Sequence, residues 1–340
     1  MRKYDTEAHF LTKEYQAYLQ SRKEVPREEM YKGFLRLWFD QGVWEPHAAR
    51  LEEKLLDLGD GRIRDMDESG IDVQILSLTA PGCEQFSADV GTEQARKAND
   101  VLAQAVRRYP GRFIGLAALA PQNPTEAAKE LERCVKELGF KGAKINSHVG
   151  LDYLDEEKYW PIFEVAEKLD VPIHLHPVTP HPTMLGLYAK YGFALSGPVL
   201  GFGAETALHA LRLIFSGLFD RYPRLKIILG HLGEGLVFWI WRIDFTVRKP
   251  WIDEEVKPRI KKAPSQYVRD NFVVTTSGMF ATPAFMSVLH EIGADRIMFA
   301  VDYPYESNEE AVRWLEQVPI PDIDKERVAH VTADRLLKLG

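Results

Sequence analysis

The 340-residue chain has only two cysteines, Cys83 and Cys134, and no Cys-x-x-Cys pair. So few cysteines exclude a disulfide framework and a cysteine-rich zinc site, and they are typical of a reducing compartment. No apolar run approaches the roughly 18 residues that a membrane-spanning helix needs. The residues after Met1 lack the apolar core of a signal peptide. We therefore expect a cytoplasmic protein with no membrane partner.

Charge of one sign is also scarce, because 43 Lys and Arg residues are interleaved with 50 Asp and Glu residues, for a net charge of −7. The absence of a basic patch argues against nucleic acid as a partner. Low-complexity segments and Gly/Ser linkers are missing as well. What the chain does have is 45% hydrophobic residues, which is enough for a large buried core. We predict a single domain over residues 1–340.

Short apolar runs alternate with helix-like stretches along most of the chain. Residues 13–68 interrupt this alternation, and we predict a long, mainly helical insertion there that covers one end of the domain. Strands are expected at 4–10, 72–78, 113–119, 142–146, 172–176, 226–231, 272–276 and 296–302, with helices or long loops between them.

Eight strands, each followed by a helix or a long loop, predict an α/β fold of the (β/α)8 TIM-barrel type. The alternative is a doubly wound open sheet. That fold usually carries a glycine-rich phosphate turn after its first strand, and residues 4–10 are followed by no such turn. In a barrel of this type the active site lies at the C-terminal ends of the strands.

The stretch 226–235 illustrates what those strand ends carry. The apolar residues 227–229 predict a buried strand that runs into His231, which Gly230 and Gly233 flank, with Glu234 three residues further on. A lone histidine in such a place is usually satisfied by the neighbouring backbone. Here other predicted strands also deliver ligand-type residues at their ends, which favours a chemical role.

Glu7 and His9 lie two residues apart on the first strand and therefore share a face. His176 ends the fifth strand, with His174 buried behind it, and Asp302 ends the eighth. Imidazoles and carboxylates converging from separate strands suit Zn²⁺ or Mn²⁺ with open coordination positions. We therefore predict a metal site.

Several stretches, taken together, resemble the amidohydrolase superfamily and, within it, the branch of metal-dependent aromatic-acid decarboxylases. Among the γ-resorcylate, 2,3-dihydroxybenzoate and 5-carboxyvanillate decarboxylases of that branch, the 5-carboxyvanillate enzymes resemble the chain most. The matching stretches are 6–10, 55–58, 66–67, 70–72, 140–142, 145–148, 176–177, 201–203, 205–206, 230–234, 241–244 and 302–305.

The resemblance implies one divalent metal ion, with Glu7, His176 and Asp302 as ligands and His9 as the additional ligand of the resorcylate type. It implies that His231 is the active-site histidine and that Glu234 is its hydrogen-bonding partner. Lys144 on the fourth strand is interpreted as a residue that does not bridge two metals.

The resemblance also implies a small aromatic carboxylate as substrate. His47 stands where the 5-carboxyvanillate type has a substrate-binding arginine, and Arg50 follows one helical turn later. Tyr305 is expected to flank the aromatic ring. His148 is assigned either to the substrate or to a loop hydrogen bond.

The reaction implied is non-oxidative decarboxylation of a hydroxylated benzoic acid, in which the ring carbon is protonated before carbon dioxide leaves. Asp302 is the expected proton donor, assisted by His231 and Glu234. The rival enzyme is a metal-dependent hydrolase of a small carboxylated or cyclic substrate, with an activated water. The non-enzyme rival is a barrel that only binds.

A homodimer or homotetramer is expected from the resemblance. The aromatic residues Phe238, Trp239, Trp241 and Trp251 fit either a helix core or a subunit contact.

Overall fold

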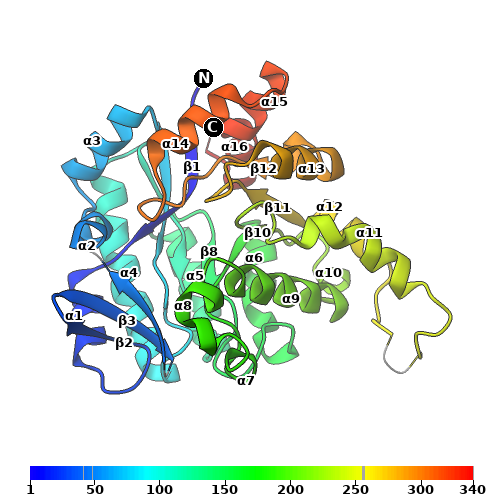
Figure 1. The fold of residues 1–340 in the computed structure, drawn as a ribbon, viewed down its shortest axis with the longest axis horizontal. Helices are drawn as coiled ribbons and strands as arrows, with labels where there is room; N and C mark the ends of the chain where they lie inside the picture. The colour runs from blue at the N-terminus through cyan, green and yellow to red at the C-terminus, as the bar shows by residue number, and fades with distance from the viewer. Residues whose placement is uncertain (41, 48, 255–256, 340) are drawn as a thin grey trace.

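The computed structural model describes residues 1–40, 42–47, 49–254 and 257–339 of the chain (Figure 1). Its centre is a ring of parallel strands made of short, buried and largely apolar segments. The strands of the ring are β1 (Tyr4–Phe10), β5 (Val73–Leu78), β6 (Phe113–Gly115), β7 (Ala117–Ala118), β8 (Ala143–Asn146), β9 (Ile173–His176), β10 (Ile227–Leu229), β11 (Phe272–Thr275) and β12 (Ile297–Met298).

The ring closes through backbone hydrogen bonds. β1 pairs with β5 and β5 with β6, while β7 to β12 pair in chain order. β6 and β7 are two halves of one strand, since the intervening Leu116 N donates to Leu76 O at 2.9 Å. The last strand meets the first where Thr6 N donates to Phe299 O at 3.1 Å and Asp302 N donates to Glu7 O at 3.0 Å. The predicted eight-stranded barrel is confirmed.

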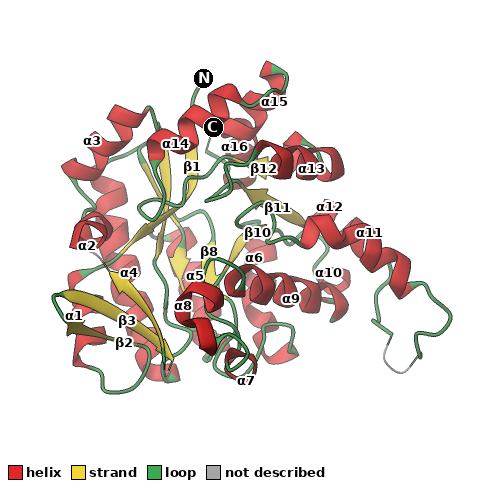
Figure 2. Ribbon diagram, in the orientation of Figure 1, coloured by secondary structure: helices red, strands yellow, loops and turns green. Residues whose placement is uncertain are grey.

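Helices surround the strands, as Figure 2 shows. Many of them begin at residues that suit a helix start; for example, the Asn123 side chain accepts the backbone N–H of Glu126 in front of α5. The helices are α1 (Lys13–Ser21), α2 (Ala49–Leu56), α3 (Asp60–Ser69), α4 (Ala88–Arg108), α5 (Pro124–Lys136), α6 (Trp160–Leu169), α7 (Pro182–Leu185), α8 (Gly192–Ser196), α9 (Gly201–Phe215), α10 (Leu218–Arg221), α11 (Leu236–Val247), α12 (Pro264–Asn271), α13 (Thr282–Ile292), α14 (Asn308–Gln317), α15 (Asp322–Glu326) and α16 (Thr332–Leu337), with short turns η1 (Glu157–Tyr159), η2 (Ala189–Tyr191), η3 (Ala294–Arg296) and η4 (Arg327–Val331).

The insertion over residues 13–68 is not mainly helical, so that prediction is wrong. Between α1 and α2 it forms an antiparallel sheet of β2 (Arg27–Tyr31), β3 (Phe34–Asp40) and β4 (Val43–His47). Its strands alternate buried and partly exposed residues, the period-2 pattern of a sheet with one covered face. Their many charged side chains obscured that pattern in the sequence. In Figure 1, β2 and β3 lie at the lower left with α1.

Two features of this architecture matter for function. All barrel strands run the same way, so their C-terminal ends meet at one mouth. Also, α11 and the loop after it extend to the right in Figure 1, away from the barrel. Within the described ranges, no helix combines the length and apolar character needed to cross a membrane.

Candidate functional site

The side chains of Glu7, His9 and His176 converge at the mouth of the barrel, with potential ligand atoms within 4.8 Å of one another. All three side chains are buried. His176 Nε2 lies 3.6 Å from Glu7 Oε1, and the His9 and His176 rings meet edge to face with centroids 4.9 Å apart. β1 and β9 thus deliver the three groups that the strand-end pattern predicted to lie together.

Asp302 joins this cluster from the eighth strand. Its Oδ1 accepts a hydrogen bond from His9 Nε2 at 2.9 Å, and its Oδ2 lies 3.5 Å from His231 Nε2. The strand β12 is shorter than predicted and ends four residues before Asp302. What holds Asp302 in place is its backbone N–H, which donates to Glu7 O.

The two oxygens of Glu7 have different surroundings. Oε2 accepts hydrogen bonds from Thr275 Oγ1 at 2.7 Å and Ser277 Oγ at 2.6 Å. Oε1 is buried and has no hydrogen-bond partner among the described residues. Leaving a buried carboxylate oxygen unsatisfied is costly in free energy. One oxygen is therefore positioned by hydroxyl groups, and the other is left available for a cation.

Gly230, just after β10, makes room for the Glu7 carboxylate. A Cβ there would lie 3.0 Å from Glu7 Oε1 and 3.1 Å from Glu7 Oε2. Any larger residue would push the carboxylate away from its hydroxyl donors. The glycine that the sequence places just before His231 is thus explained by contact with the candidate metal ligand.

His231 and Glu234 form the predicted pair. His231 Nδ1 lies 2.8 Å from Glu234 Oε1. Burial lowers the pKa of His231, but the carboxylates of Glu234 and Asp302 outweigh burial and hold that pKa well above its usual value. Burial raises the pKa of Asp302, but hydrogen bonds from His231 and His9 hold it well below its usual value. A histidine cation between two carboxylates results.

The backbone of this segment winds in a left-handed turn. Five consecutive residues, His231 to Gly235, have φ between +48° and +81°. Bonds from Gly233 N to Gly230 O, at 2.7 Å, and from Leu236 N to Gly233 O, at 2.9 Å, close successive turns. Left-handed conformation costs roughly 1–2 kcal/mol for each residue with a side chain, and strain of this kind gathers at functional sites.

His174 is buried, as predicted, and its Nε2 lies 3.6 Å from Glu7 Oε2. Lys144 projects from β8 at the position paired with His174. Its Nζ is buried without a hydrogen-bond partner among the described residues. Burial lowers the pKa of Lys144 to about 8.

The residues predicted to bind substrate do not all lie in one place. Tyr305 lies against the cluster: its ring centroid is 5.6 Å from that of His9, and its hydroxyl is 2.7 Å from Thr79 Oγ1. Arg50 is exposed, and together with Tyr305 it lines a hollow of about 550 Å³. Arg50 and Tyr305 therefore line the same hollow, which none of the candidate metal ligands lines.

His47 and His148 are both buried. His47 lies between two carboxylates of the inserted sheet, with Nε2 at 3.5 Å from Glu45 and Nδ1 at 4.0 Å from Glu28. The ring nitrogens of His148 face backbone oxygens, Gly150 O at 2.8 Å and Thr179 O at 3.1 Å. For His148 these contacts favour the loop role over contact with substrate.

The sequence reasoning missed Thr275, Ser277, Glu84 and Asn146. Thr275 and Ser277 support Glu7, and Glu84 and Asn146 form a buried pair behind His176. A signal existed for Thr275 and Ser277, because the seventh strand ends at Thr275 and continues into Thr276 and Ser277, a run of three hydroxyl residues.

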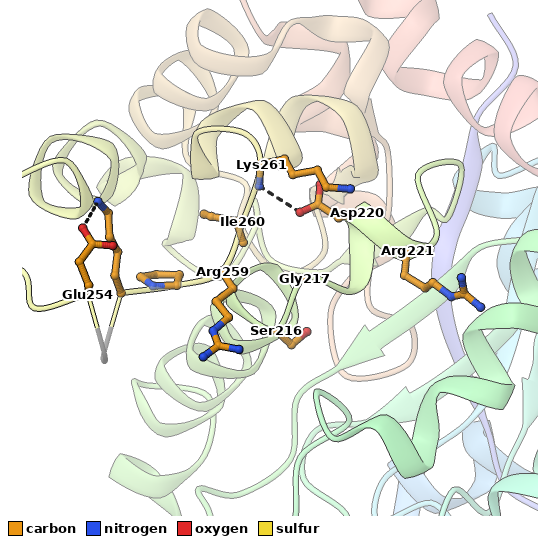
Figure 3. A pocket seen from close by; sticks show the side chains of 10 residues that line it. Ser216, Gly217, Asp220, Arg221, Glu254, Arg259, Ile260 and Lys261 are labelled. Atoms are coloured by element: carbon orange, nitrogen blue, oxygen red, sulfur yellow. Dashed lines mark hydrogen bonds and ion pairs between the residues drawn. The ribbon is translucent and has the colours of Figure 1, made fainter.

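A larger hollow, of about 770 Å³, lies elsewhere (Figure 3). Its lining includes Gly217, Asp220 and Lys261, and Lys261 N donates to Asp220 Oδ2 at 3.0 Å. α10, which contributes to it, comes just before β10, whereas His231 comes just after that strand. None of the predicted site residues lines this hollow.

A parallel eight-stranded barrel with buried carboxylates and imidazoles at its C-terminal mouth defines a class, the metal-dependent barrel enzymes. The particular family follows from comparison. A family model described as amidohydrolase matches residues 4–339. The chain belongs to the amidohydrolase family.

Similar proteins narrow the comparison further. The γ-resorcylate decarboxylase of Polaromonas sp. JS666 is 47% identical over 298 residues, which is 85% of this chain and 90% of that one. A crystal structure of a dihydroxybenzoic acid decarboxylase from Polaromonas sp. JS666, with bound manganese and the inhibitor 2-nitroresorcinol, is 42% identical. It has a TM-score of 0.85 over 99% of this chain and 97% of that one.

The structure of 5-carboxyvanillate decarboxylase from Sphingomonas paucimobilis is 35% identical, with a TM-score of 0.90 over 100% of this chain and 99% of that one. The backbone thus matches the 5-carboxyvanillate enzyme somewhat better. The sequence is nearer to the resorcylate enzyme, which corrects the expectation that the 5-carboxyvanillate type resembles the chain most.

Proposed function

We propose that the protein is a metal-dependent, non-oxidative decarboxylase of a hydroxylated benzoic acid. The observation that carries the proposal is the convergence of Glu7, His9, His176 and Asp302 beside the His231–Glu234 pair. It occurs in a chain 47% identical to a γ-resorcylate decarboxylase.

The residues at the mouth fit a divalent cation. Glu7 Oε1 is a buried oxygen without a partner, and His176 Nε2 faces it. We assign Glu7, His9, His176 and Asp302 as the ligands. This mixed N/O set suits Mn²⁺ or Zn²⁺, and manganese is the ion in the Polaromonas structure. When bound, the ion would supply Lewis-acid stabilisation to a carboxylate and a neighbouring phenolic oxygen.

The chain's own residues supply the proton. Breaking an aryl carbon–carboxylate bond directly would leave an aryl anion, so the proton must reach the ring carbon first. His231 carries a proton beside the cluster: its Nε2 faces Asp302 Oδ2 at 3.5 Å, and Glu234 holds its other nitrogen. We assign Asp302 as the group that passes the proton to the ring carbon and His231 as the group that replenishes it. The bond between the ring carbon and the carboxylate then breaks. Carbon dioxide leaves, and the electron pair of that bond restores the aromatic ring.

The inserted sheet affects the substrate specificity, that is, which benzoic acid the site accepts. His47 stands where an arginine was expected for the 5-carboxyvanillate type, and it lies between Glu28 and Glu45. Two carboxylates around one imidazole leave no net positive charge to hold a second substrate carboxylate. We therefore favour a ring with a single carboxylate and hydroxyl substituents, with Tyr305 against its face.

We further propose that the protein is a single-domain, cytoplasmic homodimer or homotetramer. Phe238, Trp239 and Trp241 of α11 are 80%, 62% and 67% exposed. Trp251, in the loop that follows, is 69% exposed. Exposed aromatic surface of this extent is typical of a protein contact.

The test is carbon dioxide release by Mn²⁺- or Zn²⁺-loaded protein, with a chelated control. The substrates are 2,3-, 2,4- and 2,6-dihydroxybenzoate, salicylate and 5-carboxyvanillate. We expect metal-dependent release from at least one single-carboxylate substrate and none from 5-carboxyvanillate. Metal binding without release from any of them would favour a metal-dependent hydrolase instead.

A further inference from the structure

A series of buried, hydrogen-bonded polar residues leads from Glu84 through Asn146 to His176. The three residues are 3%, 1% and 7% exposed. Glu84 lies in the loop after β5, Asn146 ends β8 and His176 ends β9. This series therefore connects three neighbouring parts of the barrel mouth. Its last member, His176, is the only candidate metal ligand among the three residues.

The direction of its hydrogen bonds follows from chemistry. The backbone N–H of Asn146 donates to Glu84 Oε1 at 2.7 Å. Asn146 Nδ2 lies 3.2 and 3.1 Å from the two carboxylate oxygens. A carboxylate only accepts, so the NH₂ end of the amide faces Glu84. The carbonyl end, Oδ1, is then left facing His176.

Asn146 Oδ1 lies 3.0 Å from His176 Nδ1, and Pro177 O lies 2.8 Å from the same nitrogen. Both oxygens are acceptors, so the ring proton of His176 is on Nδ1. Nε2 is then unprotonated and faces Glu7 Oε1 at 3.6 Å. That is the tautomer a metal-ligating histidine needs.

The loop after β5 is shaped around this arrangement. Gly82 has a φ of +68°, and a Cβ there would lie 2.0 Å from Asn146 Nδ2 and 2.2 Å from Glu84 Oε2. Only a glycine leaves room for the carboxylate and the amide to meet.

We propose that Glu84 and Asn146 are positioning residues of the metal site: Glu84 fixes the amide of Asn146, and Asn146 fixes the ring and the unprotonated Nε2 of His176. The inference rests on the proposed function only in that the site binds a metal. Removing outer partners of metal-ligating histidines typically lowers metal affinity about 10- to 100-fold.

The first test is Mn²⁺ affinity, measured by electron paramagnetic resonance, for the wild type, Glu84→Gln and Asn146→Leu. Glutamine can keep its carbonyl oxygen on the backbone N–H of Asn146, but it then places its NH₂ group against Asn146 Nδ2, where Glu84 Oε2 accepted a hydrogen bond. This contact between two donors removes the charged acceptor that fixes the Asn146 amide. We expect both variants to bind Mn²⁺ about 10- to 100-fold more weakly.

The matched control is Glu130→Gln. Glu130 Oε1 accepts from the buried Asn99 Nδ2 at 2.9 Å, a similar carboxylate–amide pair away from the mouth. That variant should lose stability and keep its Mn²⁺ affinity. Unchanged affinity in folded Glu84→Gln and Asn146→Leu would overturn the proposal, and so would a wild type that binds no Mn²⁺.

The second test needs neither metal nor activity. Nitrogen-15 NMR of the chelated wild type, with labelled histidine and His176→Gln for assignment, reports which ring nitrogen of His176 carries the proton. We expect the proton on Nδ1. A proton on Nε2 would refute the positioning role even if the enzyme decarboxylates every substrate tried. Failure to decarboxylate any substrate, with the proton on Nδ1 and the expected affinity losses, would count against the proposed reaction alone.

Discussion

At the scale of single residues, His231 is held by carboxylates on both ring nitrogens, Glu234 at 2.8 Å and Asp302 at 3.5 Å. The two contacts differ in what they can do. Glu234 is buried beside the helix-starting turn and orients the ring, whereas Asp302 also touches His9. We therefore expect the proton on His231 to be passed to Asp302, which belongs to the cluster of candidate metal ligands.

The variant His231→Asn removes that proton while keeping a polar side chain. We expect kcat to fall by about 10²- to 10⁴-fold, because this is the usual contribution of a positioned acid–base group. The measurement is steady-state decarboxylation with saturating metal. A fall of less than about tenfold would show that His231 only fills space.

A second histidine predicts how stability depends on pH. His209 is fully buried and accepts the backbone N–H of Leu154 at 3.0 Å. Burial, with help from the charges of His148 and Arg212, lowers the pKa of His209 to about 3. The folded protein therefore keeps His209 neutral, while the unfolded chain takes up a proton below about pH 6.5.

Because the unfolded state binds the extra proton, stability falls as the pH drops from 6.5 toward 3. At pH 5 the loss due to His209 is about 2 kcal/mol. Urea unfolding of chelated protein at pH 7 and pH 5 measures it. In His209→Gln, whose amide oxygen can still accept from Leu154, the loss between the two pH values should shrink by that amount. An equal loss in both proteins would refute the assignment.

The sequence singles out most readily the residues whose type is itself unusual at a strand end. Glu7, His176, His231 and Asp302 stand out because a carboxylate or an imidazole is rarely placed there for packing. Asn146 does not stand out, since amides often end strands, and Ser277 is marked only by the run of hydroxyl residues to which it belongs. What Asn146 and Ser277 contact depends on which groups lie opposite them on other strands, and sequence spacing does not contain that information.

At the scale of elements, the left-handed turn over His231–Gly235 predicts a conformational cost that is independent of packing. Gly235 has a φ of +77°, and a Cβ there would have open space around it. Gly235→Ala should therefore destabilise the protein by about 1–2 kcal/mol through backbone strain alone.

Gly186 provides the control. A Cβ there also has open space, but its φ is −56°, in the ordinary helical region. Gly186→Ala should leave stability unchanged or raise it by a few tenths of a kcal/mol to about 1 kcal/mol. Equal effects of the two substitutions in denaturant unfolding would show that the turn is not strained.

Elements differed in how well the sequence predicted them. Buried strands such as β1, β8 and β9 were placed within a residue because their apolar runs are short and bounded. β2, β3 and β4 were missed because charged residues in them mimic helix surface, and because pairing between antiparallel neighbours, not propensity, decides their structure.

At the scale of the whole molecule, α11 is apolar on two sides. Val237 and Ile240 face the protein interior, while Trp239 and Trp241 face outward on a helix that extends beyond the barrel (Figure 1). Large exposed aromatic side chains on a helix whose opposite face is buried mark a protein contact. The proposed oligomer would supply the missing cover.

Replacing both tryptophans, Trp239→Asp with Trp241→Asp, should lower the mass measured by light scattering to that of a smaller assembly, because two charges would be buried in the contact. The circular dichroism spectrum should not change. Ile323→Asp, an exposed apolar residue of α15 at 60% exposure, is the control and should leave the mass unaltered. A wild type that is already monomeric would refute the oligomer.

The order of the barrel was predictable from alternation alone, because parallel strands need crossover connections and the chain supplies one after each strand. Its closure was not. The first and last strands are joined by a few isolated backbone hydrogen bonds, such as the one that Asp302 N donates to Glu7 O. No local pattern announces a contact between residues 295 positions apart.

The handedness of the turn at the mouth has one more consequence, which concerns mirror-image chemistry. A D-amino acid prefers the positive φ that strains its L counterpart. At position 235, where L-alanine should cost stability, D-alanine would fit without that strain and would also restrict the unfolded chain. A semisynthetic protein carrying D-alanine there should thus be more stable than the natural chain, at a point one residue from Glu234.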